Sequence, residues 1–264
     1  MMITFLYLLA KRSDKLVYFV GAGPGDVDLI TVKGRKLLED ADVVIYAGSL
    51  VSKEHLKFCK KGAIFIDSSK LTLNEIIEYI KKFYVEGKKI VRLHSGDPTI
   101  YGAIIEQMEE LDKLGIPYEV IPGVSSFTAS CAVLKREFTV PGLSQSIIIT
   151  RLSGNTPVPE AEDLEKLAQH KTSMAIFLSV KNIEKVVEKL RSAYEEDTPI
   201  AVVYKATWKE QKVILGTLKD ICEKVKEEGI ENTAQILVGQ FLKKGGKSLL
   251  YSKDFSHSYR EARN

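Results

Sequence analysis

The fold is decided by residues 16–46, LVYFVGAGPGDVDLITVKGRKLLEDADVVIY. The apolar run Leu16–Val20 predicts a strand, Thr31–Asp40 predicts a helix, and Val43–Tyr46 predicts a second strand. A strand, a helix and another strand in this order are the repeating unit of a parallel sheet with crossover helices. The stretch therefore predicts an α/β fold.

The same alternation continues toward the carboxyl end of the first half. Thr72 and Glu75 have the spacing of a capping box, which predicts the start of a helix. The other predicted elements are strands at Ala63–Ile66, Lys89–Leu93 and Tyr118–Ile121 and a helix at Ile100–Leu114. We therefore expect one α/β domain with a mainly parallel sheet over residues 16–140.

The pattern breaks at Pro141-Gly142, and a second series of elements follows. Its predicted strands are Gln145–Thr150, Met174–Leu178, Ile200–Tyr204, Val213–Leu215 and Gln235–Val238, and its predicted helices are Glu160–Gln169, Lys181–Ser192 and Leu218–Glu227. Two α/β domains are therefore expected. Residues 1–15 would be an N-terminal extension, residues 141–242 the second domain, and residues 243–264 a C-terminal tail.

Composition and charge exclude several classes of protein. The net charge is +3, and lysines and glutamates interleave along the helical stretches, so no basic face for a nucleic acid is predicted. The three cysteines are far apart, which argues against a disulfide framework and a zinc site. The apolar start Met1–Ala10 is too short to span a bilayer. We expect a cytoplasmic protein without a nucleic-acid or membrane partner.

Three glycine-containing turns each follow a predicted strand. They are Gly21–Asp26, Ser95–Pro98 and Pro122–Ser126. Glycine lets a backbone turn tightly or approach a ligand closely, and strand ends are where α/β proteins place small-molecule sites. Three such turns in one half of the chain predict a small-molecule site.

A nicotinamide-dependent oxidoreductase is the alternative from a different class, and the first turn argues against it. Asp26 stands where the third glycine of a dinucleotide fingerprint belongs, and Pro24 removes a backbone N–H from the loop. No acidic residue follows Tyr46 to bind a ribose. The four histidines also lack metal-ligand spacing, so no metal site is expected. A non-catalytic ligand-binding module is the other alternative.

The three turns, with the residues around them, make the chain from Leu16 onward similar to the tetrapyrrole methyltransferases of cobalamin and sirohaem synthesis. Three further segments resemble the precorrin-4 C11-methyltransferase branch of that family. They are Leu152–Glu160, Tyr204–Trp208 and Leu250–His257.

The resemblance implies two α/β domains that hold S-adenosyl-L-methionine in a cleft between them, in a fold unlike the Rossmann-like methyltransferases. The cofactor-binding residues that it implies are Pro24, Ser95, Gly96, Asp97, Ile100, Ser125, Ser126, Leu178, Ala206 and Ala234. It also implies a homodimer, methyl transfer to C11 of cobalt-precorrin-4 and release of S-adenosyl-L-homocysteine. Metal-free precorrin-4, another precorrin and uroporphyrinogen are the alternative substrates. The abundance of Lys, Glu and Ile, typical of thermophiles, favours the cobalt form.

A tetrapyrrole substrate with many carboxylates would need basic side chains around the site. The candidates closest to the motifs are Arg35, Arg92, Arg151, Lys205 and Lys209. Trp208 and Tyr101 could stack on the macrocycle. His94 and Tyr101 could assist a proton transfer, but the residue pattern assigns no catalytic base.

Overall fold

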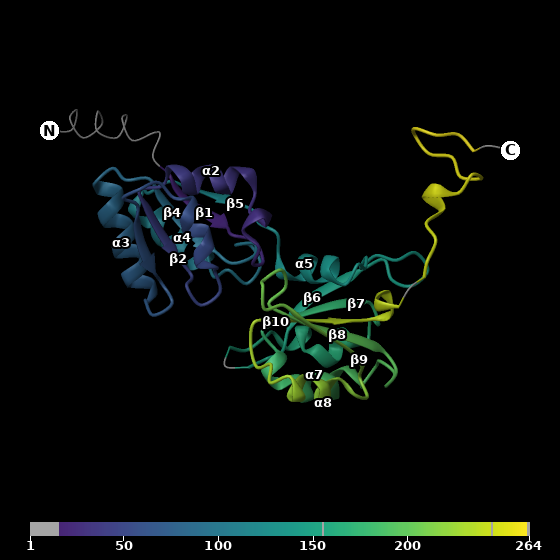
Figure 1. Ribbon diagram of the computed structural model, residues 1–264. Coiled ribbons are helices and arrows are strands. Elements are labelled where there is room, and N and C mark those ends of the chain that lie inside the picture. The colour runs from purple at the N-terminus through teal and green to yellow at the C-terminus, as the bar shows by residue number, and fades with distance from the viewer. Residues whose placement is uncertain (1–15, 155, 244, 263–264) are drawn as a thin grey trace. The chain divides into compact units, whose positions relative to one another are not determined.

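The chain forms two compact units that divide after Ser126 (Figure 1). The computed structural model describes residues 16–154, 156–243 and 245–262. The predicted N-terminal extension, residues 1–15, lies outside the described residues. Among the described residues, no helix combines the length and the apolar character that crossing a membrane requires.

The first unit is built on a fully parallel sheet, in agreement with the predicted α/β class. Its strands, in spatial order, are β3 (Ile64–Asp67), β2 (Val43–Tyr46), β4 (Ile90–His94), β1 (Val17–Gly21) and β5 (Tyr118–Ile121). The carboxyl ends of parallel strands lie at the same edge of a sheet. Because β4, β1 and β5 are neighbours, the three glycine turns that follow them lie side by side.

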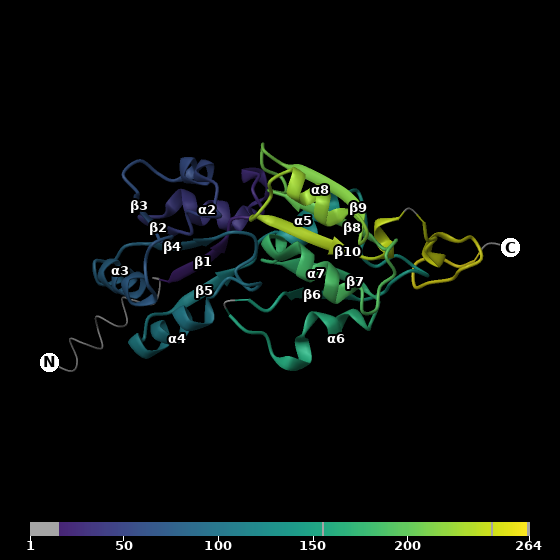
Figure 2. The ribbon, with the colours of Figure 1, turned by 90° about the horizontal axis from the view of Figure 1, so that it is seen from below.

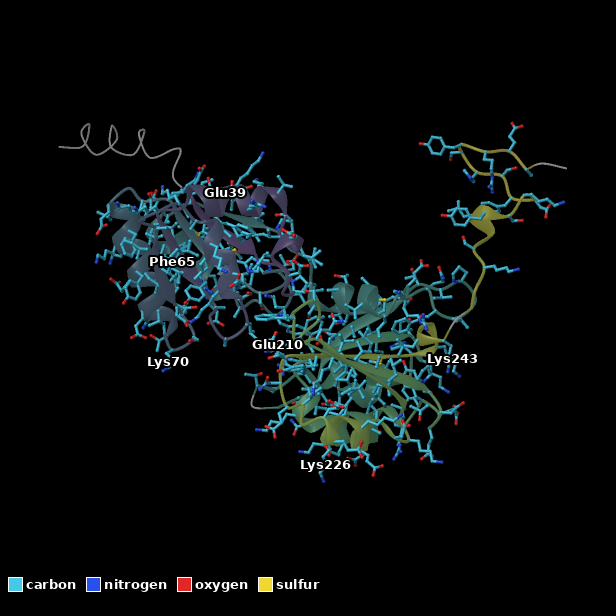
Figure 3. All side chains as sticks on the ribbon, viewed as in Figure 1. Glu39, Phe65, Lys70, Glu210, Lys226 and Lys243 are labelled. Carbon is cyan, nitrogen blue, oxygen red and sulfur yellow. The ribbon has the colours of Figure 1, made fainter. Side chains whose placement is uncertain are left out.

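Helices cover both faces of this sheet. Figure 2 shows α2 (Val32–Asp40) on one face and α3 (Leu73–Val85) and α4 (Ile105–Leu114) on the other. The predicted capping box is confirmed, because Thr72 and Glu75 hydrogen-bond each other's backbone N–H at the start of α3. Charged side chains such as Glu39 and Lys70 point outward, as the interleaved charges predicted (Figure 3).

The predicted helix Ile100–Leu114 is wrong in its first turn, since α4 begins only at Ile105. Tyr101 and Ala103 have φ values of 54° and 49°, in the left-handed region that a right-handed helix cannot use. The segment before α4 is therefore a strained loop.

The second unit contains a mixed sheet. Its strands, in spatial order, are β6 (Ile147–Arg151), β7 (Ser173–Phe177), β10 (Ala234–Val238), β8 (Pro199–Tyr204) and β9 (Lys212–Thr217). Only β6 and β7 are parallel, while β10 runs antiparallel to both β7 and β8. The chain therefore contains two α/β units with different sheets.

Helices also cover both faces of the second sheet (Figure 1). They are α6 (Leu164–Ala168), α7 (Ile183–Leu190) and α8 (Ile221–Glu227) on one face and α5 (Ser126–Val133) on the other. The predicted helix Glu160–Gln169 is shorter, because Asp163 accepts a hydrogen bond from Glu165 N and starts α6 there. The short 3₁₀ segments among the described residues are Val27–Leu29, Lys53–Phe58, Glu160–Glu162, Val180–Asn182, Gln240–Leu242 and Leu249–Tyr251.

The segment 127–140 packs with the second unit, whereas the sequence suggested that the first domain extends to residue 140. Helix α5, which the sequence pattern did not predict, contributes the buried Cys131 to this contact. Phe138 lies 4.8 Å from Phe241, measured between ring centroids. This apolar cluster explains why the two units divide earlier than the predicted boundary.

Candidate active site

The first two glycine turns are joined by their backbones. Gly96 N donates a hydrogen bond to Gly23 O at 2.8 Å, and Gly23 N donates to Gly96 O at 3.2 Å. Ala22 N donates to His94 O at 2.8 Å. The amide hydrogens of Ala22 and Gly23 are thus used inside the protein and are not free to bind a pyrophosphate, which adds to the sequence argument against a dinucleotide site.

The third turn packs against the first two without room for a side chain. A Cβ atom at Gly123 would lie 2.1 Å from Gly96 O, and one at Gly21 would lie 2.6 Å from the same oxygen. Gly96 itself has a φ of 60°, which favours glycine. Glycine is therefore required at three neighbouring positions, and the three turns form one continuous backbone surface.

Asp97 holds the second and third turns together. Its Oδ1 accepts hydrogen bonds from Thr99 N at 2.8 Å and from Thr99 Oγ1 at 2.6 Å. Its Oδ2 accepts a hydrogen bond from Gly123 N at 3.1 Å. The structure thus gives this carboxylate an internal role that the sequence did not predict.

The other predicted cofactor residues of the first unit lie on the same surface. Pro24, Ser95, Ile100 and Ser126 are half-buried, and Ser125 is 6% exposed. All of them belong to the three turns except Ile100, which lies two positions after the second turn. The structure therefore brings the seven predicted residues of the first unit to one edge of its parallel sheet.

The three predicted residues of the second unit lie at one edge of the second sheet. Leu178 directly follows β7, Ala206 follows β8, and Ala234 begins β10, which lies between those two strands. Leu178 is 72% exposed, whereas Ala206 is 6% exposed. A leucine that a strand end leaves exposed is available to contact a ligand.

Left-handed backbone is concentrated in these same loops. In the described part of the second unit, six non-glycine residues have φ values between 44° and 70°. Lys135 and Lys171 lie elsewhere, and the other four lie in these loops: Leu178, Lys205, Thr207 and Thr233. Lys205 N donates a hydrogen bond to Thr233 O at 2.9 Å, which links two of these strained positions. Such strain is typical of functional sites. The sequence pattern did not single out Thr233 as part of this edge.

Arg92 and His94 do not line an open site. Arg92 is 5% exposed, so its prediction as a basic residue at the rim of the site is wrong. His94 is 4% exposed, and burial, together with the nearby charge of Arg92, lowers its pKa to about 3. The imidazole is therefore neutral at physiological pH.

Two of the other basic candidates, Arg35 and Arg151, already have partners within the protein. Arg35 pairs with Glu39 at 2.9 Å and lies over the ring of Phe58. Arg151 donates to the backbone oxygens of its own loop, at 2.8 Å to Thr156 O and at 2.7 Å to Pro157 O. Both side chains thus have structural roles.

Lys205 is the basic candidate whose charge is held at the strained edge of the second sheet. Its Nζ lies 5.4 Å from the ring centroid of Trp208 and 5.5 Å from that of Tyr204. Glu210 Oε1 is 3.5 Å away, longer than a strong ion pair. Lys209, by contrast, is exposed.

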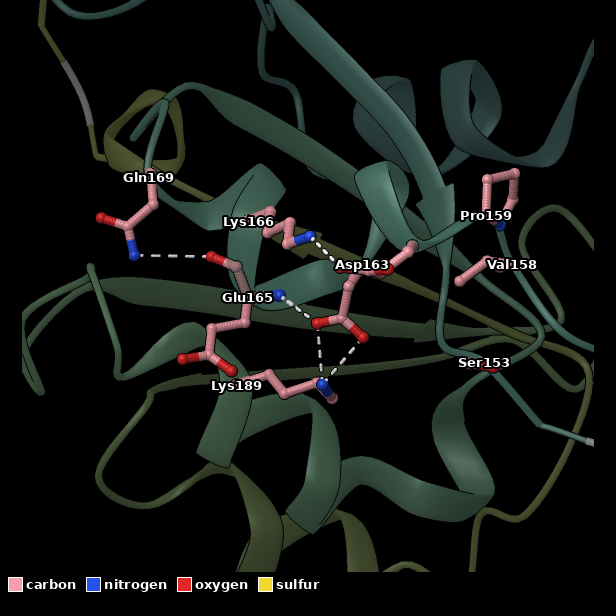
Figure 4. Close-up of a pocket in the computed structure, with 9 residues that line it drawn as sticks. Ser153, Val158, Pro159, Asp163, Glu165, Lys166, Gln169 and Lys189 are labelled. Atoms are coloured by element: carbon pink, nitrogen blue, oxygen red, sulfur yellow. Dashed lines mark hydrogen bonds and ion pairs between the residues drawn. The ribbon is translucent and has the colours of Figure 1, made fainter.

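A pocket of about 620 Å³ lies in the second unit beside the segment that resembles the precorrin-4 branch (Figure 4). Ser153, Val158 and Pro159 of that segment line it. On the facing side, Lys189 Nζ contacts both carboxylate oxygens of Asp163, at 2.8 and 2.9 Å. None of the predicted cofactor residues lines this pocket.

Comparisons with known proteins give consistent results. Residues 16–222 match the family model of the tetrapyrrole (corrin/porphyrin) methylases. The cobalt-precorrin-4 C(11)-methyltransferase of Methanocaldococcus jannaschii is 54% identical over 95% of this chain and 98% of its own. The precorrin-4 C(11)-methyltransferase of Pseudomonas aeruginosa is 44% identical over 92% of this chain and 98% of its own.

Solved structures agree with these relatives. The X-ray structure of a cobalt-precorrin-4 methyltransferase matches with a TM-score of 0.84 and 46% identity, over 86% of this chain and 96% of that one. The uroporphyrin-III C-methyltransferase of Thermus thermophilus, in complex with S-adenosyl homocysteine, matches with a TM-score of 0.71 and 25% identity. That match covers 86% of this chain and 93% of the other.

Proposed function

The chain belongs to the tetrapyrrole (corrin/porphyrin) methylase family, and from this premise we propose that it methylates C11 of cobalt-precorrin-4, giving cobalt-precorrin-5A in cobalamin biosynthesis. It is a methyltransferase. The observation that carries the choice of substrate is the near full-length similarity to a cobalt-precorrin-4 C(11)-methyltransferase.

We propose S-adenosyl-L-methionine as the methyl donor. The candidate residues at the sheet edge of each unit are chemically suited to it. The cofactor supplies an activated methyl group on a cationic sulfur. The glycine turns let the backbone approach a ligand closely, and Ser95, Ser125 and Ser126 add short hydroxyl groups. Leu178, which is 72% exposed, provides apolar surface suited to an adenine ring. None of the ten residues carries a positive charge that would repel a sulfonium.

Lys205 is the residue we propose to bind a carboxylate of the substrate. Its ammonium is held against two aromatic rings and is only weakly paired with Glu210. Its side chain is 25% exposed, so a substrate carboxylate can replace the long contact with Glu210. The strained backbone at Lys205 and Thr207 fixes the position from which the ammonium acts.

The chain's contribution to the reaction is mainly positioning. Methyl transfer to carbon requires the nucleophilic carbon and the methyl group to be held in line at close distance, and orientation of this kind lowers the barrier substantially. The buried, neutral His94 is not placed to take a proton from a substrate. We therefore assign no residue as the base.

Metal-free precorrin-4 is the second candidate substrate, because the similar Pseudomonas aeruginosa protein acts on it. The two substrates differ in the central cobalt and share the carboxylate periphery that Lys205 would bind. A homodimer and a cytoplasmic location also stay predictions. Light scattering of the purified protein tests the dimer.

The experiment that tests the proposed function is a methyl-transfer assay with purified protein. Cobalt-precorrin-4 and precorrin-4 are each incubated with S-adenosyl-L-methionine, and the products are examined by mass spectrometry. We expect the mass of one added methyl group on cobalt-precorrin-4. No added methyl group on either compound would refute the proposal.

A further inference from the structure

A buried chain of hydrogen bonds runs beneath the strained loop of the first unit. It begins at Arg92 in the central strand β4 and continues through Gln107 in α4. Both side chains are 5% exposed. Arg92 Nε donates to Gln107 Oε1 at 3.1 Å, and Gln107 Nε2 donates to Ala103 O at 2.9 Å. The amide of Gln107 thus connects a buried cation to the loop.

Arg92 has no acidic partner within 4.0 Å among the described residues. Its other hydrogen bonds go to backbone oxygens, from Nη1 to Ile45 O at 3.2 Å and to Leu93 O at 3.4 Å. Burial lowers its pKa to about 10, so the guanidinium stays charged at neutral pH. A buried charge is costly, and satisfying it only with neutral acceptors indicates a purpose beyond packing.

The loop above this chain is the most strained part of the first unit's candidate site. Tyr101 and Ala103 are left-handed, and a Cβ atom at Gly102 would lie 2.0 Å from Pro98 O. Helix α4 begins at Ile105 without a side-chain cap. The strain must therefore be held from below, where Gln107 Nε2 donates its hydrogen bond to Ala103 O.

The loop leads directly to the residues predicted to hold the cofactor. Ile100 precedes Tyr101, and Ile100 N donates a hydrogen bond to Asp97 O at 3.2 Å, which closes the turn Asp97–Ile100. We propose that Arg92 and Gln107 are positioning residues, an inference that rests on the proposed use of S-adenosyl-L-methionine. Their buried hydrogen-bond chain fixes the backbone of Tyr101–Ala103. It thereby fixes the shape in which the turn Asp97–Ile100 binds the cofactor. Neither side chain touches the cofactor in this proposal.

Gln107→Glu separates this role from a merely structural one. A glutamate oxygen would still accept the hydrogen bond from Arg92 and would neutralise the buried charge, so the fold should be kept. It would have no hydrogen to donate to Ala103 O, and its charge would repel that oxygen. Glu106→Gln is the matched control, because Glu106 is the exposed neighbour on the same helix.

The readout is calorimetric titration with S-adenosyl-L-homocysteine, together with thermal unfolding. For Gln107→Glu we expect an unchanged or higher Tm and a Kd about tenfold weaker, the effect of one lost hydrogen bond near the site. Glu106→Gln should match the wild type in both. A folded Gln107→Glu protein that binds with the wild-type Kd would overturn the inference.

A second variant covers the case in which Gln107→Glu does not fold. Gln107→Met removes both hydrogen bonds with little change in volume, and the titration separates the folded fraction, given by the stoichiometry, from the Kd of the folded molecules. A weakened Kd supports positioning, whereas reduced stoichiometry with an unchanged Kd overturns it. A wild-type protein that fails to bind at all would instead refute the proposed cofactor.

Discussion

Asp97 Oδ2 accepts a hydrogen bond from the backbone N–H of Gly123 at 3.1 Å, and this contact ties the second glycine turn to the third across 26 residues of sequence. The other oxygen, Oδ1, accepts two hydrogen bonds from Thr99. A single carboxylate thus organises two of the three turns.

Replacing this carboxylate should weaken both the fold and the site. In Asp97→Asn the amide NH₂ cannot accept one of the hydrogen bonds, and the charge that strengthens the others is lost. We expect a loss of about 1.5–3 kcal/mol in unfolding free energy and weaker binding of S-adenosyl-L-homocysteine. Thermal unfolding and calorimetry measure the two effects. Asp197→Asn, at an exposed position of the second unit, is the control.

Gly123→Ala should be one of the most harmful single-methyl changes in the first unit. The added Cβ would lie 2.1 Å from Gly96 O, and neither backbone can move without breaking the bonds between the turns. We expect destabilisation of at least about 2 kcal/mol, measured by thermal unfolding. At Gly154 nothing lies within 4 Å of the added Cβ, so Gly154→Ala should be tolerated. Equal melting temperatures for the two variants would contradict the packing described.

His94 should make the first unit sensitive to acid. Its pKa falls from 6.5 in the unfolded chain to about 3 in the folded protein, so below pH 6.5 the unfolded state binds more protons. Stability should therefore fall by about 1.4 kcal/mol for each pH unit between pH 6 and pH 4, and be unaffected by this group above pH 7.5.

Denaturant unfolding at several pH values tests the prediction for His94. In His94→Gln the part of the pH dependence due to the imidazole should disappear, whereas His170→Gln, at an exposed position, should keep the wild-type slope. If the His94→Gln protein shows the same loss of stability between pH 6 and pH 4, the imidazole is not held neutral by burial.

Lys205 and Glu210 should affect substrate binding in opposite directions. Lys205→Met removes the proposed carboxylate contact and should raise KM for the tetrapyrrole about tenfold without changing KM for the methyl donor. Glu210→Gln removes a competing carboxylate and should lower KM for the tetrapyrrole. Lys212→Met is the control, since Lys212 pairs with Glu228 on the surface at 2.8 Å. Equal KM values for all four proteins would exclude the contact.

The features of the fold that depend on local sequence pattern were predicted correctly. The alternation of apolar runs placed the strands of both sheets, and the Thr72–Glu75 spacing correctly placed the start of α3. The three glycine turns were identified because tight backbone approaches require glycine. Their convergence followed from the parallel order of β4, β1 and β5.

Features that depend on long-range contacts could not be predicted from one sequence. Arg92 was wrongly predicted at the rim of the site because its acceptor, Gln107, lies on a different element, 15 residues away. Tyr101 and Ala103 carry a Cβ atom, which disfavours left-handed backbone, so the late start of α4 comes from tertiary constraint. Helix α5 was not predicted because its apolar residues do not follow a one-sided helical pattern.

The proposed reaction is methyl transfer to one carbon of a cobalt-containing tetrapyrrole, and the position of a labelled methyl group in the product identifies that carbon. Purified protein is incubated with cobalt-precorrin-4 and S-adenosyl-L-methionine carrying ¹³C in its methyl group, and the product is analysed by NMR. We expect a single labelled methyl group on C11. A label on any other carbon, or no label in the macrocycle, would contradict it.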